Sequence, residues 1–194
     1  MTNFYFDVET CPQDKEKYLA TTDDEERKKL LNPIDSRIVA IGIKQKGKEP
    51  VILLDFEDEK KMLEEFWEKL AHFKKEHAYG KIVGFNVKNF DLPFVVTRSF
   101  INNVKIVPFV LKDVVELREQ LSAFKYGNVR GKLKEFAVLM GIEVIEGLEG
   151  DKVAELCWSE DKKTLGKYLR KDLEITEKVH ERIVELNIDK IAKW

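Results

Sequence analysis

The segment FYFDVET, residues 4–10, decides how this chain of 194 residues folds. Its apolar start predicts a buried strand, yet the strand ends on two carboxylates, Asp7 and Glu9. Residues i and i+2 of a strand point to one face, so both acids project together with Cα atoms about 6.6 Å apart, and Val8 points into the core. Two close carboxylates repel each other unless a cation such as Mg²⁺ lies between them. The segment therefore predicts a metal site, with a solvated strand end as the alternative.

The pattern beyond this strand predicts an α/β domain. Apolar, β-branched runs predict strands at 37–44 and 50–56, joined by a hairpin turn near Gly47. Helical spacing or short apolar runs predict the remaining elements: a helix in 57–77, a strand in 81–86, a helix in 91–102, a strand to about Leu111 followed by a helix to 121, and helices in 131–141 and 162–187. We expect a mixed central sheet flanked by helices, in one domain spanning 1–194.

A polar, helix-prone stretch at about 12–34 follows the first strand. The Asn32-Pro33 pair ends it, because a residue before proline is biased away from helix. We expect this stretch to be a helical insertion on the surface.

Composition excludes some classes of protein and indicates a source. The net charge is −2, so the overall charge requires no polyanion partner. The chain has 27 Lys and 23 Glu against 3 Gln, a bias typical of heat-loving organisms, although a well-solvated surface is the alternative. Cys11 and Cys157 have no metal-ligand spacing and predict structural thiols in a reducing compartment. With no apolar run of membrane-spanning length and no signal-peptide pattern, we expect a cytoplasmic protein.

A second candidate site lies in GFNVKNFDLPF, residues 84–94. Asp91 comes between a predicted strand and a predicted helix, where an ordinary N-cap is the alternative to a functional acid. Asn86 and Phe90 stand beside it, and the Phe90 ring would either join the core or stack on a nucleic-acid base. A further acid, Asp113, is interpreted as a cap or structural acid.

The third candidate site is the pair Tyr168 and Asp172 in KYLRKDLEITEKV, residues 167–179. Residues four apart share one face of a helix, and a hydrogen-bonded packing pair is the alternative to a functional one. The neighbouring leucines predict a partly buried face, and an acid on such a face requires a partner.

Taken together, these motifs resemble the DEDD superfamily of 3′–5′ exonucleases, which has the ribonuclease H-like fold. FDVET matches its first motif, FNVKNFD the second and YLRKD the third in its Tyr form. Lys167 occupies the position that carries His in the other subclass, so the Tyr subclass (DEDDy) is indicated. Along nearly the whole chain the sequence is similar to the proofreading domain of family-B DNA polymerases and its free-standing relatives. No polymerase domain fits in this length, so we expect a stand-alone enzyme or a subunit.

The resemblance implies two divalent ions, Mg²⁺ or Mn²⁺. Asp7, Glu9 and Asp172 would hold the first ion, with Asp7 bridging both, and Asp91 would hold the second through water. Tyr168 would orient the attacking water, because a phenol of pKa near 10 is a poor base. The substrate residues would be Thr10 near the 3′-terminal nucleotide and Asn86 and Phe90 along the single strand.

The expected activity is removal of nucleoside monophosphates from 3′ ends of single-stranded DNA, in repair or proofreading, with a polymerase or repair protein as a candidate partner. Three alternatives remain: trimming of RNA, a catalytically silent nucleic-acid-binding module, and a two-carboxylate glycosidase, which would leave Asp91 and Tyr168 unexplained. Candidate phosphate contacts, against plain solvation, are the basic residues in 44–48 and Lys125, Arg130, Lys132 and Lys134.

Overall fold

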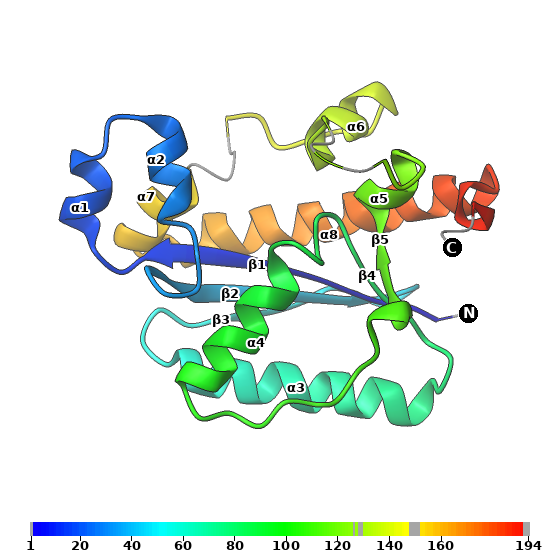
Figure 1. The fold of residues 1–194 in the computed structure, drawn as a ribbon, viewed down its shortest axis with the longest axis horizontal. Helices are drawn as coiled ribbons and strands as arrows, with labels where there is room; N and C mark the ends of the chain where they lie inside the picture. The colour runs from blue at the N-terminus through cyan, green and yellow to red at the C-terminus, as the bar shows by residue number, and fades with distance from the viewer. Residues whose placement is uncertain (1, 126, 128–129, 148–151, 192–194) are drawn as a thin grey trace.

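The computed structural model describes residues 2–125, 127, 130–147 and 152–191, and these form a mixed five-stranded sheet in the order β3-β2-β1-β4-β5 (Figure 1). The strands are β1 (Phe4–Pro12), β2 (Ser36–Gln45), β3 (Val51–Leu54), β4 (Ile82–Gly84) and β5 (Val114–Glu116). β1 is the central strand: it pairs antiparallel with β2 and parallel with β4. The predicted α/β class and mixed sheet are therefore confirmed.

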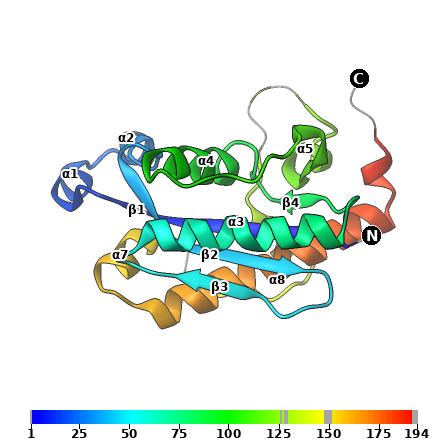
Figure 2. The same ribbon diagram turned by 90° about the horizontal axis from the view of Figure 1, so that it is seen from below.

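Helices cover both faces of this sheet (Figures 1 and 2). The helices are α1 (Lys15–Ala20), α2 (Asp24–Lys29), α3 (Glu59–Glu76), α4 (Asp91–Ile101), α5 (Leu117–Leu121), α6 (Leu133–Leu139), α7 (Val153–Trp158) and α8 (Lys162–Glu185), with 3₁₀ turns at Leu111–Asp113 and Ile188–Lys190. Helices α3 and α4 share one apolar core with the sheet, whereas α7 and α8 build the cores on its other face. Among the described residues, no helix has the length and apolar character needed to cross a membrane.

The alternation of β1 sorts its side chains between these two layers. Phe4, Phe6 and Val8 are buried on the α3 side, where the Phe4 ring lies 5.2 Å from the Phe73 ring. Tyr5 lies in the core on the α8 side, where its hydroxyl bonds to His180 Nδ1 at 2.9 Å. The acids of β1 therefore face α8, as the period of two predicts.

Helix α8 approaches the sheet closely at Gly42 of β2, which pairs with Asp7 of β1. A Cβ atom at Gly42 would lie 2.7 Å from a methyl carbon of Leu173 and 2.8 Å from Leu169 Cγ. The absence of a side chain at Gly42 thus allows α8 to lie against the strand pair, and this brings Asp172 over β1.

The strand predicted to run to Leu111 is wrong. Residues 104–110 contain no strand, and the chain joins the sheet only at Val114, opposite Ile82 of β4. Pro108 interrupts the apolar run, and proline has no N–H to donate to a ladder. The stretch at about 12–34, predicted as an insertion, contains the two short helices α1 and α2.

The prediction that the cysteines are thiols is also wrong. Cys11, in β1, and Cys157, in α7, form a disulfide across 146 residues of sequence, with Cα atoms 6.2 Å apart. Sequence spacing could not show this, because the fold alone brings the end of β1 next to α7. Disulfides occur inside cells chiefly in proteins of hyperthermophiles, so these cysteines give no support for a reducing compartment.

Candidate metal centre

The end of β1 presents Asp7 and Glu9 on the face covered by α8. The pairing of β1 with β2 shifts register after Glu9: Glu9 pairs with Ala40 and Thr10 with Ile38, so Val39 of β2 is the extra residue of a bulge-like irregularity. Bulges re-aim neighbouring side chains and are frequent beside active sites. Thr10 itself is buried at this irregularity.

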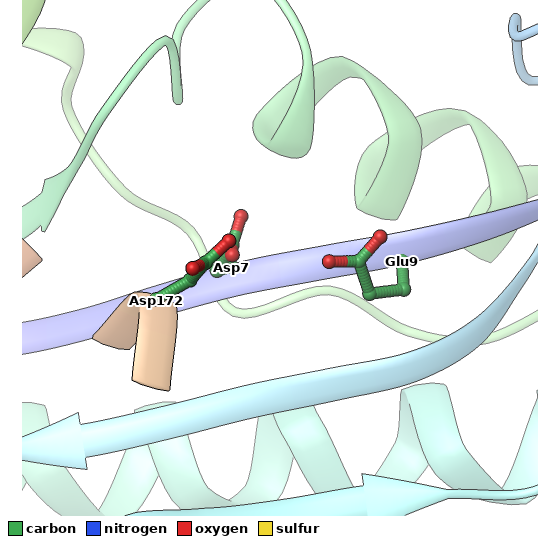
Figure 3. Close-up of side chains that lie close together, drawn as sticks. All are labelled: Asp7, Glu9 and Asp172. Atoms are coloured by element: carbon green, nitrogen blue, oxygen red, sulfur yellow. The ribbon is translucent and has the colours of Figure 1, made fainter. Parts of the chain in front are cut away.

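Asp172 of α8 completes a group of three acids (Figure 3). One carboxylate oxygen from each of Asp7, Glu9 and Asp172 lies within 4.8 Å of the others. Helix α8 supplies this acid because Leu169 and Leu173 anchor the helix against Gly42, one on each side of Asp172 in sequence. The sequence motifs at opposite ends of the chain thus meet at one point.

The negative charges of these three carboxylates repel one another when no metal is bound. Burial, followed by repulsion from neighbouring acids, raises the pKa of Asp7 and of Glu9 well above their ordinary values. Burial also raises the pKa of Asp172 to about 6. Asp172 Oδ1 is buried and has no hydrogen-bond partner in the structure. An oxygen-only donor set with an orphaned buried carboxylate oxygen fits a hard divalent cation such as Mg²⁺ or Mn²⁺.

Asp91 lies next to Asp7 but outside the group of three. Its Oδ1 accepts the backbone N–H of Val8 at 2.9 Å, and, besides burial, its negative charge is one of the causes that raise the pKa of Asp7. Burial raises the pKa of Asp91 to about 7. The N-cap alternative is wrong, because α4 starts at Asp91 itself and Phe90 occupies the cap position. Asp91 is therefore an acid of the same site, held by β1.

Tyr168 is buried one turn before Asp172, on the same face of α8. Burial, Glu9 and Asp172 all raise the pKa of the Tyr168 phenol, so it stays protonated at neutral pH. Lys134 of α6 lies over the Tyr168 ring, with Nζ 4.1 Å from the ring centroid. Its positive charge lowers the pKa of Glu9 and of Asp172, against the effect of burial. Sequence reasoning gave Lys134 only as one of several candidate phosphate contacts.

A cavity of about 240 Å³ opens at these acids. Residues from five elements and their loops line it: Asp7, Val8, Glu9, Thr10, Leu31, Phe85, Asn86, Phe90, Asp91, Leu133, Val153, Ala154, Tyr168 and Asp172. The structure thus places all eight sequence-predicted site residues on one cavity. Phe90 lines the cavity and also packs beside the core, where its ring centroid lies 4.8 Å from that of Phe94.

Glu116 is a buried acid that sequence reasoning missed. Its carboxylate accepts the backbone N–H groups of Asn86 at 2.6 Å, Lys88 at 3.1 Å and Arg118 at 3.0 Å. These bonds fix the loop between β4 and α4, in which Asn86 has a positive φ of 64°. An acid within the apolar run VVEL was the available signal, since a buried carboxylate requires donors.

Several other charged residues lie outside the site. Asp113 pairs with Lys81 at 2.6 Å, which lowers the pKa of its carboxyl, in agreement with a structural role. Within 44–48, Lys44 pairs with Glu177 at 3.1 Å and Lys46 pairs with Glu181 at 3.3 Å. These two lysines therefore serve to hold β2 against α8.

Comparison with known proteins agrees with this geometry. Residues 29–187 match a family described as a predicted 3′–5′ exonuclease related to the exonuclease domain of PolB, a range that contains Asp91, Tyr168 and Asp172. The chain is 32% identical over 169 residues to an uncharacterized protein of Methanocaldococcus jannaschii, covering 81% of this chain and 92% of that protein.

A solved structure with a similar fold is the family B DNA polymerase of the hyperthermophilic archaeon Pyrobaculum calidifontis, with a TM-score of 0.70 and 18% identity. The superposition covers 97% of this chain, which spans about a quarter (25%) of the length of the polymerase. The sheet and its helices therefore have the ribonuclease H-like arrangement of a polymerase exonuclease domain, as predicted.

Proposed function

Because the chain belongs to the family of predicted 3′–5′ exonucleases related to the exonuclease domain of PolB, we propose that it is an active, metal-dependent enzyme of the DEDDy type. It removes nucleoside monophosphates from the 3′ ends of single-stranded DNA. The observation that carries this proposal is the set of four acids and one tyrosine on a single cavity. A catalytically silent module would not need four mutually repelling acids in one place.

The four acids divide into two groups that fit two ions. Asp7, Glu9 and Asp172 would hold one ion, and Asp91, which neighbours Asp7, would hold the second together with it. When bound, a pair of Mg²⁺ or Mn²⁺ ions supplies charge stabilisation at the phosphodiester and an acidified water. The protein's own part is to keep these carboxylates ionised and fixed. The Val8 N–H contributes by binding Asp91, and Lys134 contributes by favouring the charged forms of Glu9 and Asp172.

Tyr168 orients the attacking water. Its phenol keeps its proton, so it acts as a hydrogen-bonding group and not as a base. Asp172 lies one turn away on the same face of α8, and the Lys134 ammonium lies over the face of the ring. Positioning of this kind contributes through the reduced entropy cost of reaching the reactive geometry.

The cavity fits the terminal unit of a polynucleotide. Its volume of about 240 Å³ lies below the range of about 300–1,000 Å³ typical of small-molecule pockets, so it admits one nucleotide at a time. Thr10, at the irregularity beside Glu9, would contact the terminal nucleotide, and Asn86 and Phe90 would contact the neighbouring strand, with the ring available for stacking. A role in repair or proofreading, with a polymerase or repair protein as partner, is part of this proposal.

The test is degradation of a 5′-labelled single-stranded DNA beside the matching RNA, with Mg²⁺, Mn²⁺ or EDTA. We expect products that shorten from the 3′ end only when metal is present. We also expect DNA to be degraded faster than RNA, which would identify DNA as the substrate class. Asp7→Asn and Asp172→Asn should abolish these products. Asp113→Asn is the matched control, because that acid pairs with Lys81 outside the site, and it should retain the activity. Intact DNA and RNA with folded protein in every metal condition would contradict the proposal.

A further inference from the structure

We propose that α2 and α6 form the two walls of a groove that binds single-stranded DNA on the 5′ side of the terminal nucleotide. The inference rests on the proposed function, and it gives a role to the segment at about 12–34, for which the sequence motifs provide none. Figure 1 shows α1, α2 and α7 gathered at one end of the molecule, with α6 above α8.

The groove is continuous with the cavity at the acids. It has a volume of about 570 Å³ and is lined by residues of α1, α2, α6 and α8 and the turns beside them: Tyr18, Asp24, Arg27, Lys28, Leu31, Lys132, Leu133, Lys134, Glu135, Tyr168 and Asp172. Four of these also line the smaller cavity: Leu31, Leu133, Tyr168 and Asp172. A strand whose 3′ end enters the cavity can therefore continue directly into the groove.

The charge of the groove favours phosphates. Apart from Asp172, its lining has four cationic residues and two acidic ones. The cations outnumber these two acids by two, although Asp24 pairs with Arg27 at 3.8 Å and Lys28 pairs with Glu25 of the same helix at 2.5 Å. Single-strand binding proteins combine such a positive groove with sequence-tolerant contacts.

A larger cavity elsewhere has the opposite character. About 750 Å³ in volume, it lies between the β2–β3 hairpin and α3, and none of the four acids of the site lines it. Its lining has four glutamates against three lysines besides His72, so it lacks the excess of cationic residues that the groove has. Size alone therefore does not select the binding groove, whereas charge and continuity with the acids do.

The α2 wall is held in place before any strand binds. The Tyr18 ring packs edge-on against Trp158 of α7 at 5.4 Å, and the Arg27 guanidinium lies 5.3 Å from the Tyr18 ring. Arg27 also donates to the carbonyl of Thr21 at 2.7 Å, which ties α2 back to the end of α1. Trp158 follows Cys157, whose disulfide joins α7 to β1. A pre-formed wall lowers the ordering cost of binding.

The test separates the groove from the chemistry by substrate length. The double variant Lys28→Glu/Lys132→Glu reverses one charge on each wall, and Lys60→Glu/Lys75→Glu on α3 is the control with the same change in net charge. The substrates are an eight-residue oligothymidylate and the p-nitrophenyl ester of thymidine 5′-monophosphate, which fills only the terminal cavity.

We expect the groove variant to lose at least about tenfold in kcat/KM on the octamer, and its log affinity to depend less on log salt by about 1.4, as for two lost phosphate contacts. Its hydrolysis of the ester should stay within about twofold of the wild type, and the control should behave as the wild type on both substrates. Equal loss on octamer and ester, or no loss on either, would overturn the groove.

The failure of the proposed function would be seen separately. In that case the wild type would cleave neither substrate. Fluorescence anisotropy with the labelled octamer in EDTA would then measure binding in the groove without the reaction. Weaker binding by the groove variant than by the control would support it, and equal binding would overturn it.

Discussion

Replacing Asp172 by Asn should stabilise the metal-free protein while abolishing its activity. Burial raises the pKa of Asp172 from 3.8 to about 6 in the folded protein. A pKa difference of one between the folded and unfolded states corresponds to about 1.36 kcal/mol, so the ionised carboxylate lowers the free energy of unfolding by about 3 kcal/mol. Asn has nearly the same shape as Asp and carries no charge.

The sign of the pH dependence follows from the raised pKa. Between pH 3.8 and about 6 the folded protein binds more protons at Asp172 than the unfolded chain does, so wild-type stability falls as the pH rises through this window. The advantage of Asp172→Asn should therefore be near zero at pH 4 and complete above pH 7. At about 2–4 °C per kcal/mol for a chain of this size, the gain in Tm is about 6–12 °C.

Thermal unfolding followed by circular dichroism in EDTA, from pH 4 to 8, measures this gain. Addition of Mg²⁺ at a hundred times its Kd should raise wild-type stability by about 2.7 kcal/mol and nearly close the gap. Asp113→Asn is the control of opposite sign, because Lys81 lowers the pKa of Asp113 and its loss should not stabilise the protein. A lower Tm for Asp172→Asn than for the wild type in EDTA at pH 8, or a difference in Tm that does not change with pH, would contradict this prediction.

Three further changes test other parts of the structure. Glu116→Gln should lower the free energy of unfolding, measured in urea, by about 1–3 kcal/mol, because it removes one carboxylate oxygen that accepts a backbone N–H of the β4–α4 loop. It should also raise KM for single-stranded DNA, and an unchanged KM would contradict the positioning role of Glu116. Tyr168→Phe should lower kcat about 10–100-fold without removing a limb from the pH–rate profile between pH 6 and 9, whereas loss of such a limb would mean that the phenol acts as a base. Cys11→Ser/Cys157→Ser should lower the free energy of unfolding by up to about 5 kcal/mol, because the bond closes a loop of 146 residues; equal urea midpoints for the variant and the oxidised wild type would contradict this.

The parts of the site that the sequence predicts are those with local signals. The strand period of two puts Asp7 and Glu9 on one face, and the helical spacing of four puts Tyr168 and Asp172 on another. Both placements agree with the structure, because neither depends on the rest of the fold. That the two faces meet was inferred only from the resemblance to a known family.

The features that the sequence does not predict depend on tertiary contacts. The Cys11–Cys157 bond requires α7 to lie beside β1, and the groove requires α2 and α6 to face each other. Glu116 looks like an ordinary polar residue in a short strand until its three backbone donors are known. The apolar run before Leu111 has the pattern of a strand, but Pro108 within it cannot donate a ladder hydrogen bond. The strand begins three residues after Leu111, at Val114, which pairs with Ile82 of β4.

The candidate metal centre also sets the earliest moment at which this chain can act. Its acids come from the first strand and from α8, and the neighbouring bond between Tyr5 and His180 spans 175 residues. During synthesis at about 5–20 residues per second, β1 leaves the ribosome roughly 9–35 seconds before its partner helix is made. Before α8 is made, the nascent chain therefore carries three of the four acids, Asp7, Glu9 and Asp91, and lacks Asp172. The proposed exonuclease activity therefore requires that α8 has been translated and has docked against β1.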